Sequence, residues 1–497
     1  MSTKDIRIQY SGLVIFAAKI VSVLTGLIFQ YIVAQSLNEL QYDLWFNIND
    51  IANYFVLLSG VLPFWAMRYV TRDKEGAVKT GVFANLTISA VASIVYLLLI
   101  PTVLSALHVS QAFLPTYLLI AIQIIEVHSI SIMESCLQAR IPQRVGYGLL
   151  VQQFTKVLLG YVLIVIFNQL LLGAVVATIA AFALQVFFYV KTLINEFRKK
   201  LCIGYVREWL KGSLFNMYNV IGNQIAAYIF IMLFAYGGDG ARGILGGGAT
   251  IVNVITYSSF LSFALYPKLL AEKKTDEVSS TLKMVLMFAI PLTIGALALP
   301  DSYIILLRPQ IAGSGPVLIV LAVDAFVTVI SGFYTSVLYG MENVDEGSRL
   351  SFRQFAKSRM LIAFSLPYLH SAITLPTAFY LLTNYARDQP FQAALYVSAI
   401  NAIARFAMFI VLYFVVRGMI QVHIPWKSIS KYVLAAAVMG GVLYLTPHPT
   451  ETFVTLVETA IGGLIYIGLL MAIDKEVRRL PRDIIAEFRQ KQTATES

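Results

Sequence analysis

The sequence predicts an all-α protein that crosses a lipid membrane many times. Three observations predict this fold class: 58% of the 497 residues are hydrophobic, only 13% are charged, and apolar stretches long enough to span a bilayer recur along the chain. A typical soluble domain is less apolar and carries about twice this share of charged residues. We therefore expect a polytopic membrane protein.

About fourteen transmembrane helices are predicted in chain order. Their ranges are 11–36, 43–67, 79–101, 113–137, 147–168, 170–191, 212–236, 243–267, 281–300, 316–340, 359–382, 392–416, 430–446 and 452–473. The first stretch is too long for the apolar core of a signal peptide, and no small-residue cleavage pattern follows it. It is therefore predicted to be a retained spanning helix.

The loops between these helices alternate strongly in basic charge. With the N-terminus in the cytoplasm, the loops richest in Lys and Arg all fall inside, whereas little beyond Arg242, Arg308 and Arg387 falls outside. This asymmetry predicts a protein of the cytoplasmic membrane with both termini in the cytoplasm. It also accounts for most of the net charge of +10, so a nucleic-acid partner is not expected.

An internal repeat divides the predicted helices into two groups. The segment "QQFTK" at 152–156 is echoed by "RQFAK" at 353–357, and Pro63 at the inner end of the second helix is echoed by Pro267 at the inner end of the eighth. Such spacing is typical of transporters built from two similar halves. We expect two pseudo-symmetric six-helix lobes in parallel orientation, at 1–200 and 201–420, followed at 421–497 by two additional helices and a basic cytoplasmic tail.

Motifs that would indicate an enzyme or a cofactor site are either absent from the sequence or lie in the wrong structural context. The segment "GDGARG" at 238–243 matches GxGxxG, but it falls in a predicted outer loop and not between a strand and a helix, so we expect a flexible turn. No Walker A motif, HExxH, CxxC pair or nucleophile elbow occurs in the sequence. The sequence thus predicts no catalytic residue, cofactor or metal site, and any uphill transport would draw on a gradient or a partner.

Charged side chains lie inside the predicted spans, where each costs roughly 2.5–3.5 kcal/mol at the bilayer centre and needs a partner, a cavity or water. The cations are Lys19, Lys156 and Arg405, and the acids are Asp50, Glu126 and Asp324. Asparagines share helix faces with these charges or form a stripe of their own on the seventh helix; they are Asn47, Asn401, Asn216, Asn219 and Asn223. We expect these polar faces to line one water-filled cavity between the lobes.

The three cations indicate which class of ligand the predicted cavity would bind. Three positive charges around one cavity would attract an anion, and Lys and Arg commonly bind phosphate or diphosphate. We predict that Lys19, Lys156 and Arg405 bind the cargo together with the asparagines. For Lys19 the alternative is a salt bridge to Asp50, and for Lys156 it is an ammonium that reaches the membrane interface.

The acidic residues in the predicted spans have two possible roles. Glu126 and Asp324 are predicted either as counter-ions to the cations or as coupling sites for H⁺ or Na⁺, and Asp50 is a further candidate of this kind. Asp43 lies near a helix end, so we expect it to be solvated.

Two further stretches carry a resemblance to a known family. "ALYPKLLAEKK" closes the predicted eighth helix and "LYGMENVDEG" follows the tenth, within two six-helix lobes and two extra helices. In these features the chain resembles the polysaccharide transporters of the multidrug/oligosaccharidyl-lipid/polysaccharide (MOP) exporter superfamily, which includes O-antigen and lipid II flippases. The resemblance implies alternating access and a lipid-linked glycan whose phosphate is held by cavity cations. It also implies that Lys19 occupies the kind of position at which lipid II flippases have cavity arginines.

The predicted function follows from the resemblance and the buried cations. We expect a flippase that moves a polyprenyl-(di)phosphate-linked oligosaccharide or polysaccharide unit across the cytoplasmic membrane. The alternative is a MATE-like exporter of small molecules coupled to H⁺ or Na⁺. A membrane-embedded glycosyltransferase or glycan ligase fits less well, because the predicted outer loops are short. The expected partners are the lipid-linked glycan, membrane lipids and a coupling ion, with a glycan polymerase or glycosyltransferases as further candidates.

Overall fold

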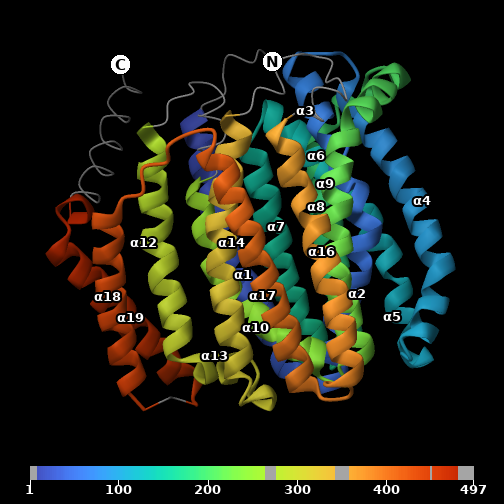
Figure 1. Ribbon diagram of the computed structural model, residues 1–497. Helices are drawn as coiled ribbons and strands as arrows, with labels where there is room; N and C mark the ends of the chain where they lie inside the picture. The colour runs from blue at the N-terminus through green and yellow to red at the C-terminus, as the bar shows by residue number, and fades with distance from the viewer. Residues whose placement is uncertain (1–7, 263–275, 342–357, 448–449, 479–497) are drawn as a thin grey trace. The chain divides into compact units, whose positions relative to one another are not determined.

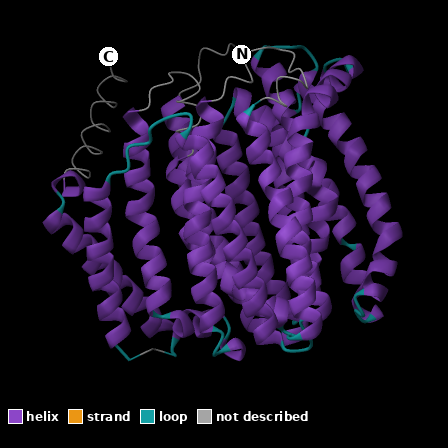
Figure 2. Cartoon of the chain, viewed as in Figure 1, coloured by secondary structure: helices purple, strands orange, loops and turns teal. Residues whose placement is uncertain are grey.

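The computed structural model describes residues 8–262, 276–341, 358–447 and 450–478, and within these ranges every regular element is a helix (Figures 1 and 2). The first eight α-helices are α1 (Ile8–Ser36), α2 (Glu39–Val56), α3 (Pro63–Thr71), α4 (Ala77–Ala106), α5 (Leu114–Leu118), α6 (Ile120–Arg140), α7 (Gln143–Gly160) and α8 (Leu170–Leu193). The others are α9 (Ile203–Tyr236), α10 (Ala241–Thr256), α12 (Asp276–Ala298), α13 (Pro300–Leu307), α14 (Gly315–Met341), α16 (Arg359–Asn384), α17 (Pro390–Arg417), α18 (Trp426–Leu445) and α19 (Thr452–Ile473). The predicted all-α fold is confirmed.

Twelve helical segments of the described chain are long and apolar enough to cross a membrane. Two further predicted spans, 11–36 and 243–267, overlap α1 and α10, whose described apolar parts are shorter, and residues 263–267 lie outside the described residues. Short 3₁₀ turns and one π-helical segment extend or join the helices; they are Leu57–Gly60, Gln111–Phe113, Glu196–Arg198, Tyr257–Ser262 and Pro309–Ile311, and Tyr161–Ile166. The predicted polytopic membrane protein is confirmed, and the predicted number of helices is approximate.

Large apolar side chains cover the outside of many of these helices. Leu98 is 73% exposed, Ile403 is 71% exposed and Leu464 is 70% exposed. A monomeric soluble protein rarely exposes so much contiguous apolar surface, whereas lipid tails accept it. Because a helix satisfies its own backbone hydrogen bonds, these segments can face hydrocarbon without unpaired polar groups.

The structure consists of two compact units, which are described separately below. Unit 1 comprises Met1–Gly246 and Phe364–Val397, and unit 2 comprises Gly247–Ala363 and Ser398–Ser497. The two predicted six-helix lobes stay a prediction. Pro267 and the segment 353–357, which carry half of the predicted repeat, lie outside the described residues.

The second predicted span is broken within unit 1. A 3₁₀ turn separates α2 from α3, and α3 begins at Pro63, a residue that suits the first turn because it has no backbone N–H to satisfy. Side chains from neighbouring helices bind carbonyls at the break: Ser213 Oγ donates to the Val61 carbonyl (3.1 Å), and Asn85 Nδ2 donates to the Ser59 carbonyl (3.4 Å). A break at membrane depth is tolerated where such partners exist.

In unit 2 the last two helices pack onto the rest of the unit. α18 packs against α12 and α19, and Tyr466 of α19 donates a hydrogen bond to the Met287 carbonyl of α12 (2.7 Å). At the ends of the helices, Lys431 Nζ lies 3.2 Å from Asp474 Oδ2. The two additional helices predicted after residue 420 are therefore present, and they are attached to unit 2.

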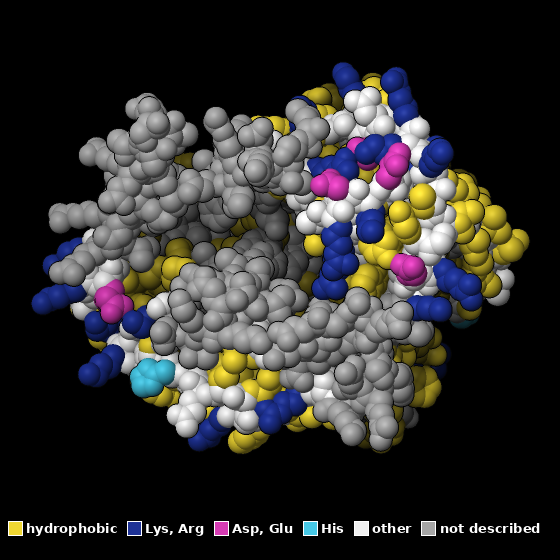
Figure 3. Space-filling model, turned by 90° about the horizontal axis from the view of Figure 1, so that it is seen from above, with side chains coloured by type: hydrophobic (Ala, Val, Ile, Leu, Met, Phe, Trp, Pro, Cys, Tyr) yellow, Lys and Arg dark blue, Asp and Glu magenta, His cyan; other side chains and the backbone are white. Residues whose placement is uncertain are grey.

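Basic side chains gather on one face of unit 1, over the ends of α3, α6, α8 and α9 (Figure 3). The exposed ones are Arg72, Lys74, Arg144, Lys191, Arg198, Lys200, Arg207 and Lys211. The predicted cytoplasmic loops contain these residues, so the gathering agrees with the charge asymmetry of the sequence. The orientation in the membrane stays a prediction.

Candidate functional site

One face of α2 carries a row of polar side chains that runs along most of the helix. Asp43, Asn47, Asp50 and Tyr54 follow one another at intervals of three or four residues, a spacing that places them on one helix face. Asp43 is 2% exposed and Asn47 is fully buried. Because the row crosses the interior of unit 1, each side chain needs a partner there.

Asp43 finds its partner at the N-terminus of α10. Its carboxylate accepts hydrogen bonds from the backbone N–H groups of Gly240 (2.8 Å) and Gly243. Gly240 has a φ angle of 91°, which favours glycine, and a Cβ atom at Gly243 would lie 2.9 Å from the Tyr42 ring. The prediction that Asp43 is solvated is wrong. The GDGARG segment binds a carboxylate of the protein itself, as the free N–H groups and dipole of a helix N-terminus allow.

Asp50 forms a bidentate ion pair with Arg242 of α10. Arg242 Nε donates to Asp50 Oδ2 (2.6 Å) and Nη2 donates to Oδ1 (2.9 Å), and the two side chains are 8% and 11% exposed. The guanidinium also lies 4.9 Å from the ring centroids of both Phe46 and Phe230, which gives it two cation–π contacts. The charge pattern of the sequence predicts Arg242 in an outer loop, and this prediction is wrong: Arg242 is buried, on the first turn of α10.

The rest of the row connects α2 to α5 and α9. Asn47 Oδ1 accepts a hydrogen bond from the Tyr117 hydroxyl (2.7 Å), and the Tyr54 hydroxyl donates to the Gln224 carbonyl (3.2 Å). Asn47 is therefore enclosed by the protein in this conformation. Its predicted role as a cargo ligand would require this region to open.

The asparagine stripe on α9 is partly accessible. Asn223 is exposed, and its Nδ2 donates to both the carbonyl (2.9 Å) and the Oδ1 atom (3.0 Å) of Asn219, one turn earlier. Tyr368 of α16 packs over Gly222, where a Cβ atom would lie 2.6 Å from its ring. Asn216 lies on α9, but its side chain is outside the part of the structure that is described.

Lys156 is a cation without a carboxylate partner among the described side chains. It lies on α7, and its Nζ atom is 5.2 Å from the ring centroid of Phe29 on α1. Only a cation–π contact thus accompanies a charge that remains half-buried. Lys19, the other predicted cation of the first lobe, lies on α1, but its side chain is outside the described residues.

In unit 2, Arg405 of α17 pairs with Asp324 of α14. The Arg405 Nε atom lies 2.8 Å from Asp324 Oδ1, and the side chains are 35% and 11% exposed. This is the geometry of a cation and its counter-ion, one of the two arrangements predicted for Asp324. Asn401, one turn before Arg405 on α17, is half-buried.

Glu126 of α6 has a different environment. Its side chain is 8% exposed, and Oε2 has no hydrogen-bond partner. No ion pair of Glu126 occurs among the described side chains. A buried carboxyl group without a cation is expensive unless it holds a proton or binds a cation. In the described ranges, no group of three or more His, Cys, Asp or Glu residues could hold a metal ion.

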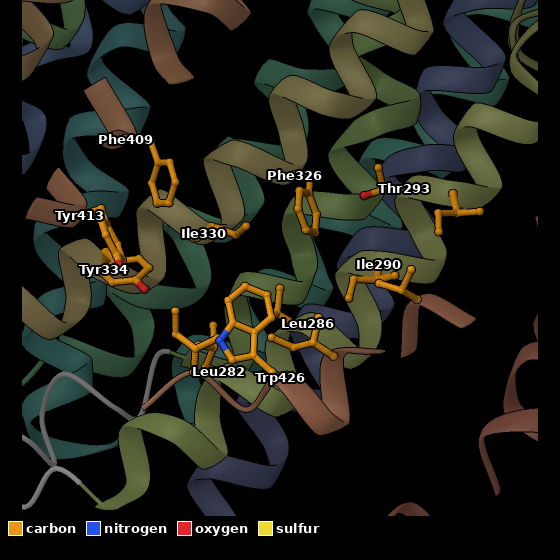
Figure 4. Close-up of a pocket in the computed structure, with 14 residues that line it drawn as sticks. Leu282, Leu286, Ile290, Thr293, Phe326, Ile330, Tyr334, Phe409, Tyr413 and Trp426 are labelled. Carbon is orange, nitrogen blue, oxygen red and sulfur yellow. The ribbon is translucent and has the colours of Figure 1, made fainter. Parts of the chain in front are cut away.

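Unit 2 contains an apolar groove of about 620 Å³ between α12, α14, α17 and α18 (Figure 4). In Figure 4, Tyr334, Phe409 and Tyr413 line one side, and Ile290 and Thr293 lie on the other. The remaining lining residues are Leu282, Leu286, Ile294, Phe326, Ile330, Ile424, Trp426, Ile429 and Val433. Nearly all of these side chains are hydrocarbon or aromatic, so the groove suits an apolar ligand.

Arg405 lies on the same face of α17 as two residues that line the groove. Arg405, Phe409 and Tyr413 follow one another at intervals of four residues, which places them on the same face of the helix. A guanidinium therefore lies one helical turn beyond an aromatic wall of the groove. The combination offers a cation next to an apolar surface.

Comparison with solved structures shows which proteins share this fold. The structure of lipid II flippase MurJ in an inward closed conformation matches with a TM-score of 0.69 and 16% identity, over 95% of this chain and 100% of that chain. An inward-facing multidrug resistance MATE family transporter of the MOP superfamily matches with a TM-score of 0.56 and 12% identity, over 80% and 95%. A MATE protein in complex with MaL6 matches with a TM-score of 0.53 and 13% identity, over 82% and 95%.

The chain has the fold of these transporters. The prediction of a MOP-type fold is therefore confirmed. No protein-family model matches the chain, and no curated protein matches it. At identities this low, the likeness establishes the fold and leaves the cargo to be argued from the residues.

Proposed function

We propose that the protein is a flippase for a polyprenyl-(di)phosphate-linked oligosaccharide or polysaccharide unit, which it moves across the cytoplasmic membrane by alternating access. The observation that carries the proposal is the apolar groove of unit 2 with Arg405 one turn beyond it on α17. An apolar wall next to a guanidinium suits a ligand that has a hydrocarbon tail and an anionic headgroup. The fold shared with a lipid II flippase supports the same class of cargo.

Arg405 retains capacity for a second anion. Its side chain is 35% exposed, and its single short contact with Asp324 leaves other guanidinium N–H groups to donate. In the proposal these donors bind the phosphate while the groove holds the adjoining part of the lipid tail. Lys156, which lacks a carboxylate partner in the described structure, and Lys19 would add positive charge in the first lobe.

The proposal includes the orientation and the partners predicted from the sequence. Both termini would lie in the cytoplasm, where the basic face of unit 1 would meet the anionic inner leaflet. Asn219 and Asn223 are suited to hydrogen bonds with sugar hydroxyls. We propose no catalytic role, in keeping with the structurally similar transporters.

Binding of a lipid-diphosphate sugar to the purified protein tests this function. We expect Arg405→Gln to weaken binding about tenfold, and Ile330→Trp, which fills the groove, to weaken it by a similar factor. Arg387→Gln is the matched control, because this arginine is 74% exposed and lies away from the groove residues in sequence. Equal affinity in the wild type, Arg405→Gln and Ile330→Trp would rule the proposal out.

Glu126 favours a second candidate, a MATE-like exporter coupled to H⁺ or Na⁺. A buried carboxyl group without an ion pair in the described structure is the kind of group that carries a coupling ion, and Asp50 and Asp324 are both already paired. Efflux of a cationic dye from proteoliposomes under an imposed H⁺ or Na⁺ gradient would distinguish the two functions. The exporter predicts efflux that Glu126→Gln abolishes, whereas the flippase predicts no dye efflux.

A further inference from the structure

Pro291 lies in the interior of α12, one of the helices that line the groove of unit 2. Proline has no backbone N–H, so the carbonyl of Met287, four residues earlier, loses its partner within the helix. The proline ring also crowds this carbonyl, a crowding that bends helices at such a point. Because α12 is long and apolar enough to span a membrane, the carbonyl needs a donor from elsewhere in the protein.

The missing donor comes from α19. The Tyr466 hydroxyl donates to the Met287 carbonyl (2.7 Å), and the Tyr466 side chain is 6% exposed. A carbonyl that bonds to a neighbouring helix tilts away from the axis of its own helix, which is the change that accompanies bending. The hydrogen bond therefore favours a bent α12 over a straight one.

The proline lies in the middle of one wall of the groove. Leu286 and Ile290 line the groove before the proline, and Thr293 and Ile294 line it after the proline. Thr293 adds to the bend, because its Oγ1 atom donates to the Ala289 carbonyl (2.8 Å), a bond that often bends helices. The bend of α12 therefore sets how the two parts of this wall lie relative to the aromatic residues of α14 and α17.

α18 contacts α12 just beyond the proline. Gly440 packs so closely on Ile294 that a Cβ atom at this glycine would lie 2.5 Å from Cγ2 of the isoleucine. Three residues of α18 line the groove; they are Trp426, Ile429 and Val433. α19 thus acts on α12 before the proline by a hydrogen bond, and α18 acts on it after the proline by close packing.

We propose that Tyr466 is a positioning residue, which fixes the bend of α12 at Pro291 and thereby the shape of the groove. Tyr466 is not among the described residues that line the groove, so it acts through α12 and does not touch a ligand there. The proposal rests on the proposed function only for the identity of that ligand, a lipid tail. The bond between Tyr466 and Met287 and its effect on α12 do not depend on the cargo.

A double-mutant cycle tests the link between the hydroxyl and the proline in the purified full-length chain without any ligand. Tyr466→Phe leaves the Met287 carbonyl without a donor, so we expect the midpoint of thermal unfolding in detergent to fall by about 2–4 °C. Pro291→Ala restores an N–H that bonds the same carbonyl within α12. In that background Tyr466→Phe should lower the midpoint by less than half as much. Equal falls in the two backgrounds, or no fall in either, would overturn the proposal.

A distance measurement tests the shape of the groove directly. Spin labels are placed at Met284→Cys on α12 and Ile410→Cys on α17, which are both exposed positions, after replacement of the native Cys136 and Cys202. We expect Tyr466→Phe to raise the population of a second distance about tenfold over the wild type, because the bend is no longer fixed. An unchanged distribution of distances would overturn the proposal.

Tyr303→Phe is the matched control. It also removes a tyrosine hydroxyl that contacts α19, because Tyr303 Oη lies 3.0 Å from Thr459 Oγ1, but Tyr303 is on α13 and is not among the described groove residues. The distribution of distances between the two labels should be the same in this control as in the wild type. An equal change in Tyr303→Phe and Tyr466→Phe would indicate a general loosening of α19 and would overturn the proposal.

Binding of two lipids tests what the shape of the groove does. The probes are a long-chain polyprenyl phosphate and the polyprenol with the same tail. We expect Tyr466→Phe to weaken binding of both lipids about tenfold, because the apolar wall changes, whereas Arg405→Gln should weaken binding of the phosphate alone. Wild-type affinity of Tyr466→Phe for both lipids would overturn the proposal. If the wild type bound neither lipid, the proposed cargo alone would fail, because the double-mutant cycle and the distance measurement then decide on Tyr466.

Discussion

Two ion pairs within the described membrane spans, Asp50 with Arg242 and Asp324 with Arg405, use the same residue types in different ways. Asp50 and Arg242 in unit 1 make two hydrogen bonds, are 11% and 8% exposed, and the guanidinium contacts two aromatic rings. Asp324 and Arg405 in unit 2 share one contact, and Arg405 is 35% exposed next to an apolar groove. The difference indicates that an arginine inside a membrane protein can bind a ligand only when its carboxylate partner leaves some of the guanidinium N–H donors unused.

The largest expected effect comes from breaking the ion pair between Asp50 and Arg242, which the protein encloses. Asp50→Ala leaves Arg242 buried and unpaired, and we expect a loss of about 3–5 kcal/mol in stability, measured by thermal unfolding in detergent. Asp50→Ala combined with Arg242→Met is the control, and it should regain most of the loss because no unpaired charge remains. If Asp50→Ala were as stable as the wild type, water would have to reach the Asp50–Arg242 pair.

Overpacking beside the same pair is expected to have a smaller effect. Gly246→Leu places a side chain against the Phe46 ring, one of the two rings that flank Arg242, and we expect a loss of about 1–3 kcal/mol by the same measurement. Gly332→Ala in α14 is the matched control, because no atom lies within 4 Å of its added Cβ. That control should be neutral or more stable by up to about 1 kcal/mol. Tolerance of leucine at position 246 would contradict the close packing of α10 on α2.

A substitution in the partly exposed pair of Arg405 and Asp324 should weaken ligand binding more than it lowers stability. Arg405→Gln is expected to lower stability by about 1 kcal/mol, because Asp324 can still accept a hydrogen bond and the site is partly exposed. The same variant should weaken binding of the lipid-diphosphate sugar about tenfold. If Arg405→Gln destabilised the protein as much as Asp50→Ala, the contrast between the two pairs would fail.

The smallest effect concerns a third ion pair, between Lys431 of α18 and Asp474, a residue that follows α19 and lies outside the membrane spans. Burial would raise the pKa of Asp474, but the Glu476 N–H (2.9 Å) and the Lys431 ammonium (3.2 Å) hold that pKa below its ordinary value of 3.8. Because the folded pKa is lower than the unfolded one, the stabilisation is present above about pH 4 and is lost as the pH falls below it. Asp474→Asn should remove about 0.5–1 kcal/mol at pH 7 and flatten the acid limb of stability against pH. An unchanged acid limb would mean that Asp474 does not titrate in this range.

Much of the fold was predictable because hydropathy is a local property. The ranges 79–101 and 452–473 were sufficient to locate α4 and α19, and the short polar turn before residue 170 was sufficient to separate α7 from α8. The break between α2 and α3 was not predicted. It depends on Ser213 and Asn85, which reach the break from other helices, and the pattern around Pro63 does not reveal them.

The candidate site was predictable in its residue types but not in its pairings. Asp324 and Arg405 were both singled out as buried charges, and the structure places them together. Arg242 was missed, because in sequence it resembles Arg387: both arginines lie near a polar turn between two spans. The structure leaves Arg387 74% exposed and buries Arg242 against Asp50.

The sequence by itself determined that this chain spans a membrane as many helices and that charges lie within them. Those properties follow from the composition of each segment, whatever its neighbours are. Only the tertiary structure decided that Asp43 caps α10, that Asp50 pairs with Arg242, and that Arg405 stays partly exposed beside a groove. The partner of a buried charge depends on which helices are neighbours and on how each is rotated about its axis, and a local pattern does not contain that information about residues nearly 200 positions away.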